Sequence, residues 1–240
     1  MIKTALFFFI FWFGLMISLL FLPGFYFCKI FKLKNAEKKY VYYVTRRWAR
    51  FTLFTAGVKI SVKGLENAPE SRSGFVVISN HQGNFDIPVI IACLPFAAGF
   101  IAKYEMTKFP FISSWMRALD CLFIKRNRPR EAGNRIFERI RQTDKNPIFL
   151  FPEGTRSKGP EMGTFKTGSL KLLFQNQSDV FPVTIKGSYK CFEDQNVIKK
   201  STIEVFFHPV LSSRNFQPSQ FEDFNSELQR IISVPLKSSI

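Results

Sequence analysis

Short apolar runs separated by helix-like segments fill the chain from Val58 onward. The runs are rich in β-branched and aromatic residues, which is typical of buried strands. They occupy residues 74–79, 100–102, 121–124, 147–151, 180–185 and 203–207. Between two of them, the segment 130–143 places Ile136, Phe137 and Ile140 on one helical face. This alternation predicts an α/β fold, a mainly parallel sheet covered by helices.

A different pattern occupies the N-terminus, where Thr4 to Leu22 carry no charge. Nineteen helical residues rising about 1.5 Å each cover roughly 28 Å, close to the hydrocarbon core of a bilayer. A cleaved signal peptide has a shorter apolar region, of about 7 to 15 residues, followed by small residues. Here the bulky sequence Gly24-Phe25-Tyr26-Phe27 follows. We therefore expect a helix that spans a membrane or inserts deeply into it.

Basic residues follow this apolar run. Eight lie between Lys29 and Arg50 against one acid, Glu37, whereas only Lys3 and the amino terminus precede it. Such an excess marks the cytoplasmic side, so we expect everything after the apolar run to lie on the cytoplasmic face of a membrane. A second helix is predicted from Asn35, as its cap, to about Thr55. Its basic face suits anionic headgroups, and the helix equally suits packing on the following domain.

The predicted organisation is thus a membrane-inserted and amphipathic helical segment, 1–56, followed by an α/β domain, 57–240. A net charge of +16 suits either nucleic acid or an anionic membrane surface. The 30 phenylalanines, gathered in long apolar runs, favour membrane lipids and no nucleic acid. The four cysteines form no Cys-x-x-Cys pair, which predicts reduced thiols and no metal site.

Polar residues cluster where the strand at 74–79 ends and a helix containing Pro88 begins. One of the two histidines, His81, stands here, five residues before Asp86. On a continuous helix the two would be about 140° apart, but a turn at Gly83 would let the carboxylate reach the imidazole. His81 would then be a general base and Asp86 its orienting partner. The alternative is a strand-end histidine beside a helix-capping aspartate.

Charged residues also follow three later strands: Lys103, Lys125-Arg126 and the segment 153–156. The carboxyl ends of parallel strands converge on one crevice, so Lys103, Arg126 and Arg156 are predicted to line one anion pocket. Within the last segment, Gly154 would let the backbone approach a ligand, and Glu153 would accept from a ligand hydroxyl. The alternatives are solvated strand ends and an ordinary tight turn.

These motifs, taken in order, resemble a known family. Asn80-His81-x4-Asp86, Leu122–Arg126, Phe151–Ser157 and Val180–Val183, with the trailing Phe165-Lys166-Thr167-Gly168, are similar to the motifs of the glycerolipid acyltransferases typified by 1-acylglycerol-3-phosphate acyltransferase. The resemblance covers about residues 60–210. It implies transfer of a fatty acyl group from acyl-CoA or acyl carrier protein to the free hydroxyl of a lysophospholipid. With 1-acylglycerol-3-phosphate as acceptor, the product is phosphatidic acid.

The resemblance also implies roles for residues. His81 is the catalytic base and Asp86 its partner. The residues expected to bind the substrate are Lys103, Arg126, Glu153, Gly154, Thr155 and Arg156. The second motif departs from the family pattern, with Asp120 in place of a common glycine and Lys125 in place of an aspartate. These departures leave the acceptor headgroup open between lysophosphatidic acid and another lysophospholipid.

Two further classes of function stay open from the residues. A lipase or thioesterase with a serine or cysteine nucleophile is one, although the sequence has no Gly-x-Ser-x-Gly elbow. A non-catalytic membrane-anchored protein that binds lipid is the other. We expect the acyl donor as co-substrate, no cofactor and no metal, and as partners the lysophospholipid, the acyl thioester, membrane lipids and, as one of the two donors, acyl carrier protein.

Overall fold

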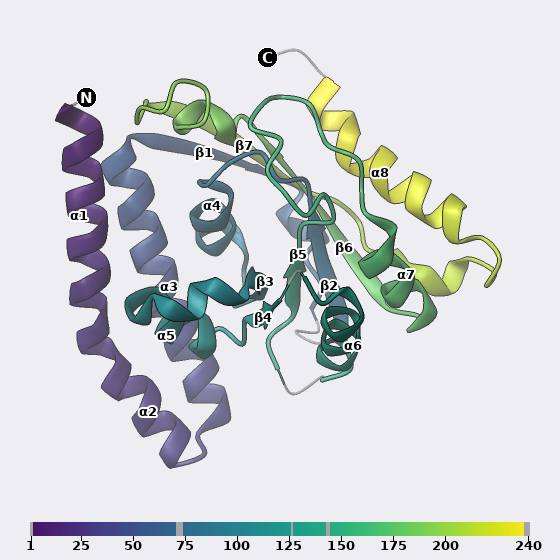
Figure 1. Cartoon of the computed structure of the whole chain (residues 1–240), viewed down its shortest axis with the longest axis horizontal. Coiled ribbons are helices and arrows are strands. Elements are labelled where there is room, and N and C mark those ends of the chain that lie inside the picture. The colour runs from purple at the N-terminus through teal and green to yellow at the C-terminus, as the bar shows by residue number, and fades with distance from the viewer. Residues whose placement is uncertain (1, 71–73, 126, 143–144, 238–240) are drawn as a thin grey trace.

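The computed structural model describes residues 2–70, 74–125, 127–142 and 145–237, and within these residues one eight-stranded sheet forms the centre (Figure 1). The strand order is β1-β7-β6-β2-β5-β3-β4, with β8 beside β6. The bounds are β1 Val58–Lys63, β2 Phe75–Ser79, β3 Gly99–Lys103, β4 Leu122–Ile124, β5 Ile148–Leu150, β6 Asp179–Lys186, β7 Ser201–Phe207 and β8 Leu211–Ser212. Only the pairs β6–β7 and β6–β8 are antiparallel among these strands. The predicted mainly parallel α/β sheet is confirmed.

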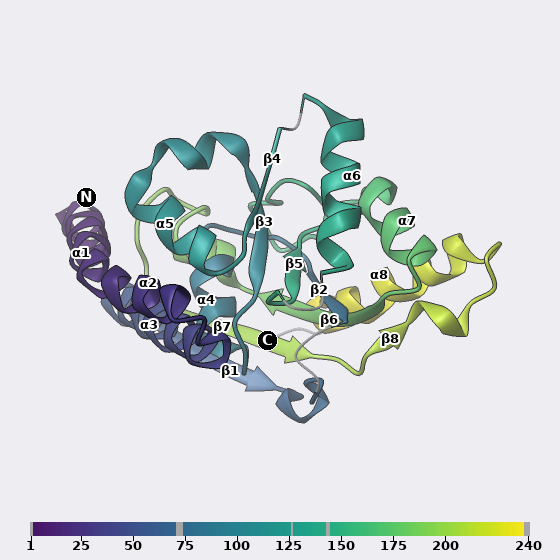
Figure 2. The same cartoon turned by 90° about the horizontal axis from the view of Figure 1, so that it is seen from below.

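Helices cover both faces of this sheet. They are α1 Ile2–Ser18, α2 Leu22–Ile30, α3 Lys34–Ala56, α4 Asp86–Cys93, α5 Pro110–Ala118, α6 Pro129–Ile140, α7 Thr167–Gln175 and α8 Phe221–Lys237. Figure 2 shows α6, α7 and α8 on one side of the strands and α1 to α5 on the other. Along β2, Phe75 and Val77 belong to the core beside α3 and α4, whereas Val76 and Ile78 belong to the core beside α7 and α8. Burial on both faces explains the unbroken apolar run in this strand.

The N-terminal helices form an antiparallel pair. The helical stretch Ile2–Ile30 is long and apolar enough, by length and composition, to cross a membrane. It turns back into α3, which lies alongside it (Figure 1). Phe7 of α1 joins the core of the α/β part, and its ring lies 5.8 Å from that of Phe85. Most other side chains of the stretch are exposed, so one face packs on the protein and the other is an apolar surface suited to anchoring in lipid.

The predicted second helix is present as α3, but its start differs from the prediction. The helix begins at Lys34, and its N-cap is Leu33, two residues before the expected cap and without a side-chain cap hydrogen bond. Asn35 therefore lies inside the first turn. The helix ends at Ala56, and Gly57 follows in the left-handed conformation with φ of 73°. Buried Val41, Ala49 and Leu53 pack this helix on the rest of the protein.

Several elements were not assigned from the sequence. They are β1, β8, α5, α7 and α8. In α8 the signal was present, because the buried residues Phe224, Leu228 and Ile232 recur every four residues, as one face of a helix requires. Strand β1 is a six-residue edge strand with partly exposed side chains on both faces. Its sequence therefore lacks the strong apolar run that identified the central strands.

A buried asparagine joins the end of β2 to β6. Asn80 is fully buried, its Nδ2 donates to the Ile185 carbonyl at 2.8 Å, and its Oδ1 accepts from the Ile185 N–H at 2.8 Å. Replacing Asn80 with Ala leaves both backbone groups unpaired. We expect a loss of about 2–6 kcal/mol in the free energy of unfolding, since each of the two buried unsatisfied groups costs about 1–3 kcal/mol. Urea unfolding in detergent measures the loss. The exposed Asn134→Ala is the control, and a loss as small as that of the control would contradict this role.

Candidate active site

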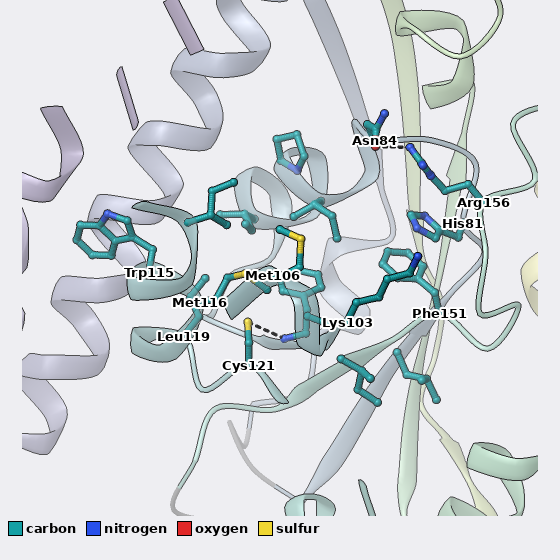
Figure 3. Close-up of a pocket in the computed structure, with 18 of the residues that line it drawn as sticks. His81, Asn84, Lys103, Met106, Trp115, Met116, Leu119, Cys121, Phe151 and Arg156 are labelled. Carbon is teal, nitrogen blue, oxygen red and sulfur yellow. Dashed lines mark hydrogen bonds between the residues drawn. The ribbon is translucent and has the colours of Figure 1, made fainter. Parts of the chain in front are cut away.

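The polar residues that follow the central strands meet at one edge of the sheet. His81 comes after β2, Lys103 ends β3, and Pro152 and Arg156 come after β5. Strands β2, β3 and β5 are parallel, so their carboxyl ends lie together. All four residues line a single cavity of about 1110 Å³. Figure 3 shows His81, Phe151, Lys103 and Arg156 at one end of this cavity and Trp115 with Met116 at the other.

His81 and Asp86 are in direct contact through the predicted turn. Imidazole Nδ1 lies 2.7 Å from Asp86 Oδ2. The carboxylate is fully buried and accepts further hydrogen bonds, at Oδ2 from the N–H groups of Gln82 (2.7 Å) and Gly83 (3.0 Å) and at Oδ1 from the hydroxyl of Ser188. A buried charge needs such partners. The chain reverses at Gly83, so a carboxylate at the start of α4 reaches back to the end of β2.

This contact fixes the chemistry of the imidazole. An ionised carboxylate only accepts hydrogen bonds, so Nδ1 carries the proton and Nε2 is left as an acceptor. The side chain of His81 is 18% exposed, and its ring stacks on Phe151 with centroids 4.0 Å apart and planes 17° apart. No described residue hydrogen-bonds to Nε2. The arrangement is that of a neutral imidazole able to take a proton from a hydroxyl in the cavity.

Glu153 is not among the described residues that line the cavity. We expected it to accept from a ligand hydroxyl. Instead, its Oε1 accepts from the backbone N–H of His81 at 2.6 Å and its Oε2 from that of Gly163 at 2.8 Å. The side chain is buried, and burial raises the pKa of this carboxyl, although the two N–H donors act in the opposite direction. The local sequence could not show this, because Glu153 contacts His81 from 72 positions away. The geometry supports a positioning role.

The four N–H groups of residues 81–84 all donate to carboxylates. His81 donates to Glu153, Gln82 and Gly83 donate to Asp86, and Asn84 donates to Glu193 at 2.6 Å. Three acidic side chains, the neighbouring Asp86 and the distant Glu153 and Glu193, therefore fix one short turn. The N–H groups of Gln82 and Gly83 converge on one oxygen, as in the backbone nests that bind anions, and here the protein's own Asp86 supplies that oxygen.

Cations lie on either side of His81. Arg156 Nη1 donates to Asn84 Oδ1 and lies 3.4 Å from Glu193 Oε1. Lys103 extends from β3 toward Phe151 and His81 (Figure 3), and its ammonium makes no hydrogen bond or ion pair with a described residue. Burial raises the pKa of Glu193, while Arg156 acts in the opposite direction. Two of the three predicted cations therefore share this end of the cavity, and Arg126 lies outside the described residues.

Gly154 and Thr155 also line the cavity. Gly154 has a φ of +70°, which favours glycine, and a Cβ there would lie 3.0 Å from the ammonium nitrogen of Lys166. The close approach predicted at Gly154 is therefore made, in this structure, by a lysine of the protein. Lys166 lines the same cavity.

The two residues that depart from the family pattern have structural partners. Asp120 has a φ of 63°, in the left-handed region where glycine is common. Its Oδ2 accepts from the N–H and the Nδ2 of Asn146 at 3.1 Å each, and its Oδ1 pairs with Lys145 at 3.2 Å. The ammonium of Lys125 lies over the Tyr104 ring, 4.7 Å from its centroid. Neither residue is among the described residues that line the cavity.

Sequence reasoning missed two residues of this site. Ser188 follows β6, which is parallel to β2, so the rule that identified the other strand ends would have found it. Glu193 lies in an irregular segment after that strand, and no motif points to it. Its contact with Asn84 joins residues 109 positions apart. Only the folded chain reveals such a pairing.

The raised pKa of Glu153 leads to a pH-dependent prediction. A carboxyl whose pKa is higher in the folded than in the unfolded state contributes stability that is lost as the pH rises through the folded value. The difference in unfolding free energy between wild type and Glu153→Gln should therefore shift in favour of the variant as the pH rises above the ordinary range of glutamate. Urea unfolding from pH 4.5 to pH 8 measures this difference. A shift in favour of wild type would be inconsistent with burial as the dominant influence on this carboxyl.

Comparisons with known proteins agree with this geometry. The family model described as Acyltransferase matches residues 59–186. A 1-acyl-sn-glycerol-3-phosphate acyltransferase of Borreliella burgdorferi is 27% identical over 196 residues, covering 80% of this chain and 78% of that protein. The chloroplastic 1-acyl-sn-glycerol-3-phosphate acyltransferase LPAT1 of Arabidopsis thaliana is 29% identical over 184 residues, or 74% of this chain. The chain spans about half the length of that plant protein, 51%.

A solved structure is similar along nearly the whole chain. The crystal structure of the 1-acyl-sn-glycerophosphate acyltransferase PlsC from Thermotoga maritima superimposes with a TM-score of 0.83 at 25% sequence identity, covering 98% of this chain and 95% of that one. The family model matches more than half of the 240 residues and includes the His81–Asp86 pair and Arg156. The chain therefore belongs to the Acyltransferase family, as its motifs predicted.

Proposed function

We propose that this acyltransferase moves a fatty acyl group from an acyl thioester to the free hydroxyl of 1-acylglycerol-3-phosphate, giving phosphatidic acid. The observation that carries the proposal is the Nδ1–Oδ2 contact of 2.7 Å between His81 and Asp86, in one cavity with Arg156 and Lys103. The names of the relatives support 1-acylglycerol-3-phosphate as the acceptor. The donor, acyl-CoA or acyl carrier protein, rests on the resemblance of the motifs.

The imidazole of His81 would act first as a base and then as an acid in this reaction. The acceptor hydroxyl donates to His81 Nε2, which takes the proton as the oxygen attacks the thioester carbonyl carbon. Asp86 stabilises the imidazolium that forms. As the carbon–sulfur bond breaks, the imidazolium returns the proton to the departing thiolate. The new ester and the free thiol balance the reaction without a covalent enzyme intermediate.

The cations of the cavity suit a phosphate-bearing acceptor. Arg156 presents a guanidinium held in place by Asn84 and Glu193, and an arginine can donate two parallel hydrogen bonds to a phosphate. Lys103 supplies a second charge near the imidazole. The carboxylate of Asp120 accepts a hydrogen bond from Asn146 and forms an ion pair with Lys145. Asp120 is not among the described residues that line the cavity, so it adds no negative charge to the cavity wall. These contacts favour a glycerol phosphate over a headgroup that carries its own cation.

The size and walls of the cavity support two lipid substrates. Its volume of about 1110 Å³ lies just above the range typical of ligand pockets, roughly 300–1,000 Å³. Helices α1, α3 and α5 give its apolar walls, with Phe7, Phe11, Trp48 and Trp115 among the lining residues. A fatty acyl chain in this part of the cavity would lie beside the helices that expose apolar surface.

We also propose that the outer face of α1 and α2 lies in the cytoplasmic leaflet, with the catalytic part on the cytoplasmic side. The exposed side chains of these helices include Phe9 at 68% and Ile30 at 73%. The excess of basic residues after this apolar stretch supports the orientation. Because Phe7 packs against Phe85 at the start of α4, insertion of α1 would bring the cavity to the membrane surface.

The proton transfer is tested by replacing its two groups. His81→Ala should lower kcat by about 10²–10⁴-fold, the usual contribution of a general base. Asp86→Asn should cause a loss of the same order, because an amide cannot fix the imidazole tautomer as a carboxylate does. Phosphatidic acid formed from lysophosphatidic acid and acyl-CoA is measured by mass spectrometry. His208→Ala is the matched control, because His208 pairs with Thr184 outside the cavity.

The outcomes also separate the competing functions. A wild-type protein that binds lysolipid and forms no product from any lysolipid would support the non-catalytic binding protein. Product from a different lysophospholipid, with none from lysophosphatidic acid, would support the alternative acceptor. Full activity of His81→Ala would leave the family assignment in place and exclude His81 as the base.

Membrane anchoring is tested on the outer face of α1. Phe9 and Phe13 are exposed, and their rings stack with centroids 6.1 Å apart. Burying one such side chain is worth about 1.5–3 kcal/mol, so Phe9→Glu with Phe13→Glu should weaken binding to anionic phospholipid vesicles at least tenfold. Vesicle flotation measures the binding. Val234→Glu, at an exposed apolar position of α8, is the control, and equal binding by both variants would argue against this surface.

A further inference from the structure

The cavity extends from one face of the sheet to the other. Consecutive residues Phe100–Lys103 of β3 and Leu150–Pro152 at the end of β5 line it. Successive side chains of a strand point to opposite faces, so the cavity passes over the carboxyl ends of these strands. It continues between α6 and α7, which lie on the opposite side of the sheet from α3 and α5 (Figure 2). We name this part the α6–α7 arm, lined by Ala132, Gly133, Ile136, Gly168, Ser169 and Leu172.

Two glycines in the walls of the α6–α7 arm are not required by the fold. Neither Gly133 nor Gly168 has a positive φ. A Cβ at Gly168 would meet nothing within 4 Å, and one at Gly133 would make only an ordinary contact of 3.6 Å with Leu172. Gly133 lies inside α6, where glycine costs roughly 0.5–1 kcal/mol relative to alanine. What the two glycines provide, against that cost, is open space on the wall of the cavity.

A lysine lies where the α6–α7 arm joins the catalytic end. The side chain of Lys166 crosses Gly154, and a Cβ on that glycine would lie 3.0 Å from Nζ and 3.3 Å from Cδ and Cε. Its ammonium makes no hydrogen bond or ion pair with a described residue, although it lines the same cavity as His81. Lys166 and Gly168 belong to a motif that the proposed proton transfer does not use. The unpaired ammonium of Lys166 therefore lies beside a channel whose walls include several small residues.

We propose that the α6–α7 arm binds the pantetheine chain of the acyl donor, and that Lys166 donates to the first amide carbonyl of that chain. This inference rests on the proposed function. An acyl thioester has an apolar fatty chain on one side of its carbonyl and a thin, polar pantetheine chain on the other. The fatty chain suits the aromatic walls near α1, α3 and α5. In the proposed function, Arg156 binds the phosphate of the acceptor.

The pantetheine chain needs the properties that the α6–α7 arm has. Its stretch nearest the sulfur, through the first two amides, is unbranched, so it fits between helices whose facing residues include Ala132, Gly133, Gly168 and Ser169. Its first amide lies two methylene groups from the sulfur, so a donor for that carbonyl must stand close to the reaction centre, as Lys166 does beside Gly154. The chain is hydrophilic, and the arm lies on the face of the sheet away from the exposed apolar helices α1 and α2. Acyl-CoA and acyl carrier protein share this chain.

The steric test adds a side chain to the arm. Gly168→Leu should raise the KM for acyl-CoA at least tenfold and leave the KM for lysophosphatidic acid within twofold of wild type. Because a Cβ at Gly168 meets open space, the melting temperature should be equal or higher. Gly159→Leu is the matched control, since a Cβ there also meets nothing and Gly159 is not among the residues that line the cavity.

The charge test compares three donors of the same fatty acid with Lys166→Met. Acyl-CoA carries the whole pantetheine chain, the N-acetylcysteamine thioester keeps only the first amide, and the S-ethyl thioester has none. The variant should lose catalytic efficiency at least fivefold with the first two donors and less than twofold with the S-ethyl thioester. Both natural donors that wild type accepts should be affected alike, because the shared chain makes the contact.

The outcomes distinguish this inference from the proposed function. Wild-type protein that forms no phosphatidic acid refutes the proposed function, and the inference with it. If wild type is active, an unchanged donor KM in Gly168→Leu overturns the assignment of the arm. A rise in the lysophosphatidic acid KM instead would assign the arm to the acceptor. An equal loss with the S-ethyl thioester in Lys166→Met would overturn the amide contact.

Discussion

The buried carboxylate of Asp86 is the constraint on which the rest of the site depends. A fully buried charge is tolerated only when donors surround it, and here two backbone N–H groups, the Ser188 hydroxyl and the imidazole of His81 do so. These donors come from the end of β2, the turn that follows it and the segment after β6. The requirement to satisfy one charge therefore fixes the geometry of three chain segments.

The same principle extends to two more acids. Glu153 accepts a hydrogen bond from the N–H of His81, and Glu193 accepts one from the N–H of Asn84. Hydrogen bonds to carboxylates therefore hold the whole turn 81–84 in place. One consequence concerns the oxyanion that forms during attack on the thioester. The N–H groups of this turn are already occupied, so the oxyanion must be stabilised by donors elsewhere on the cavity wall. The turn serves to orient the imidazole.

The sequence predicted those features that depend on local pattern. Apolar runs identified the central strands, and the rule that parallel strands end together placed His81, Lys103 and Arg156 on one cavity. The sequence did not predict which atoms form hydrogen bonds between residues that are far apart along the chain. Glu153 was expected to face a ligand because its motif shows only its neighbours in the chain, whereas its partners are backbone groups of His81 and Gly163. Glu193 had no signal, since its role exists only in the folded chain.

The charges around Arg156 suit the positioning of an anionic substrate, as the proposed function requires. Arg156 faces the cavity while Glu193, 3.4 Å away, opposes part of its charge. That carboxylate weakens the attraction for phosphate, but it also holds the guanidinium in one orientation. Interactions equally strong in the ground and transition states do not raise kcat. In the proposed function, a cation fixed in place and partly neutralised would therefore position the phosphate, and it would hold the product, which keeps the same phosphate, less tightly than an unpaired arginine would.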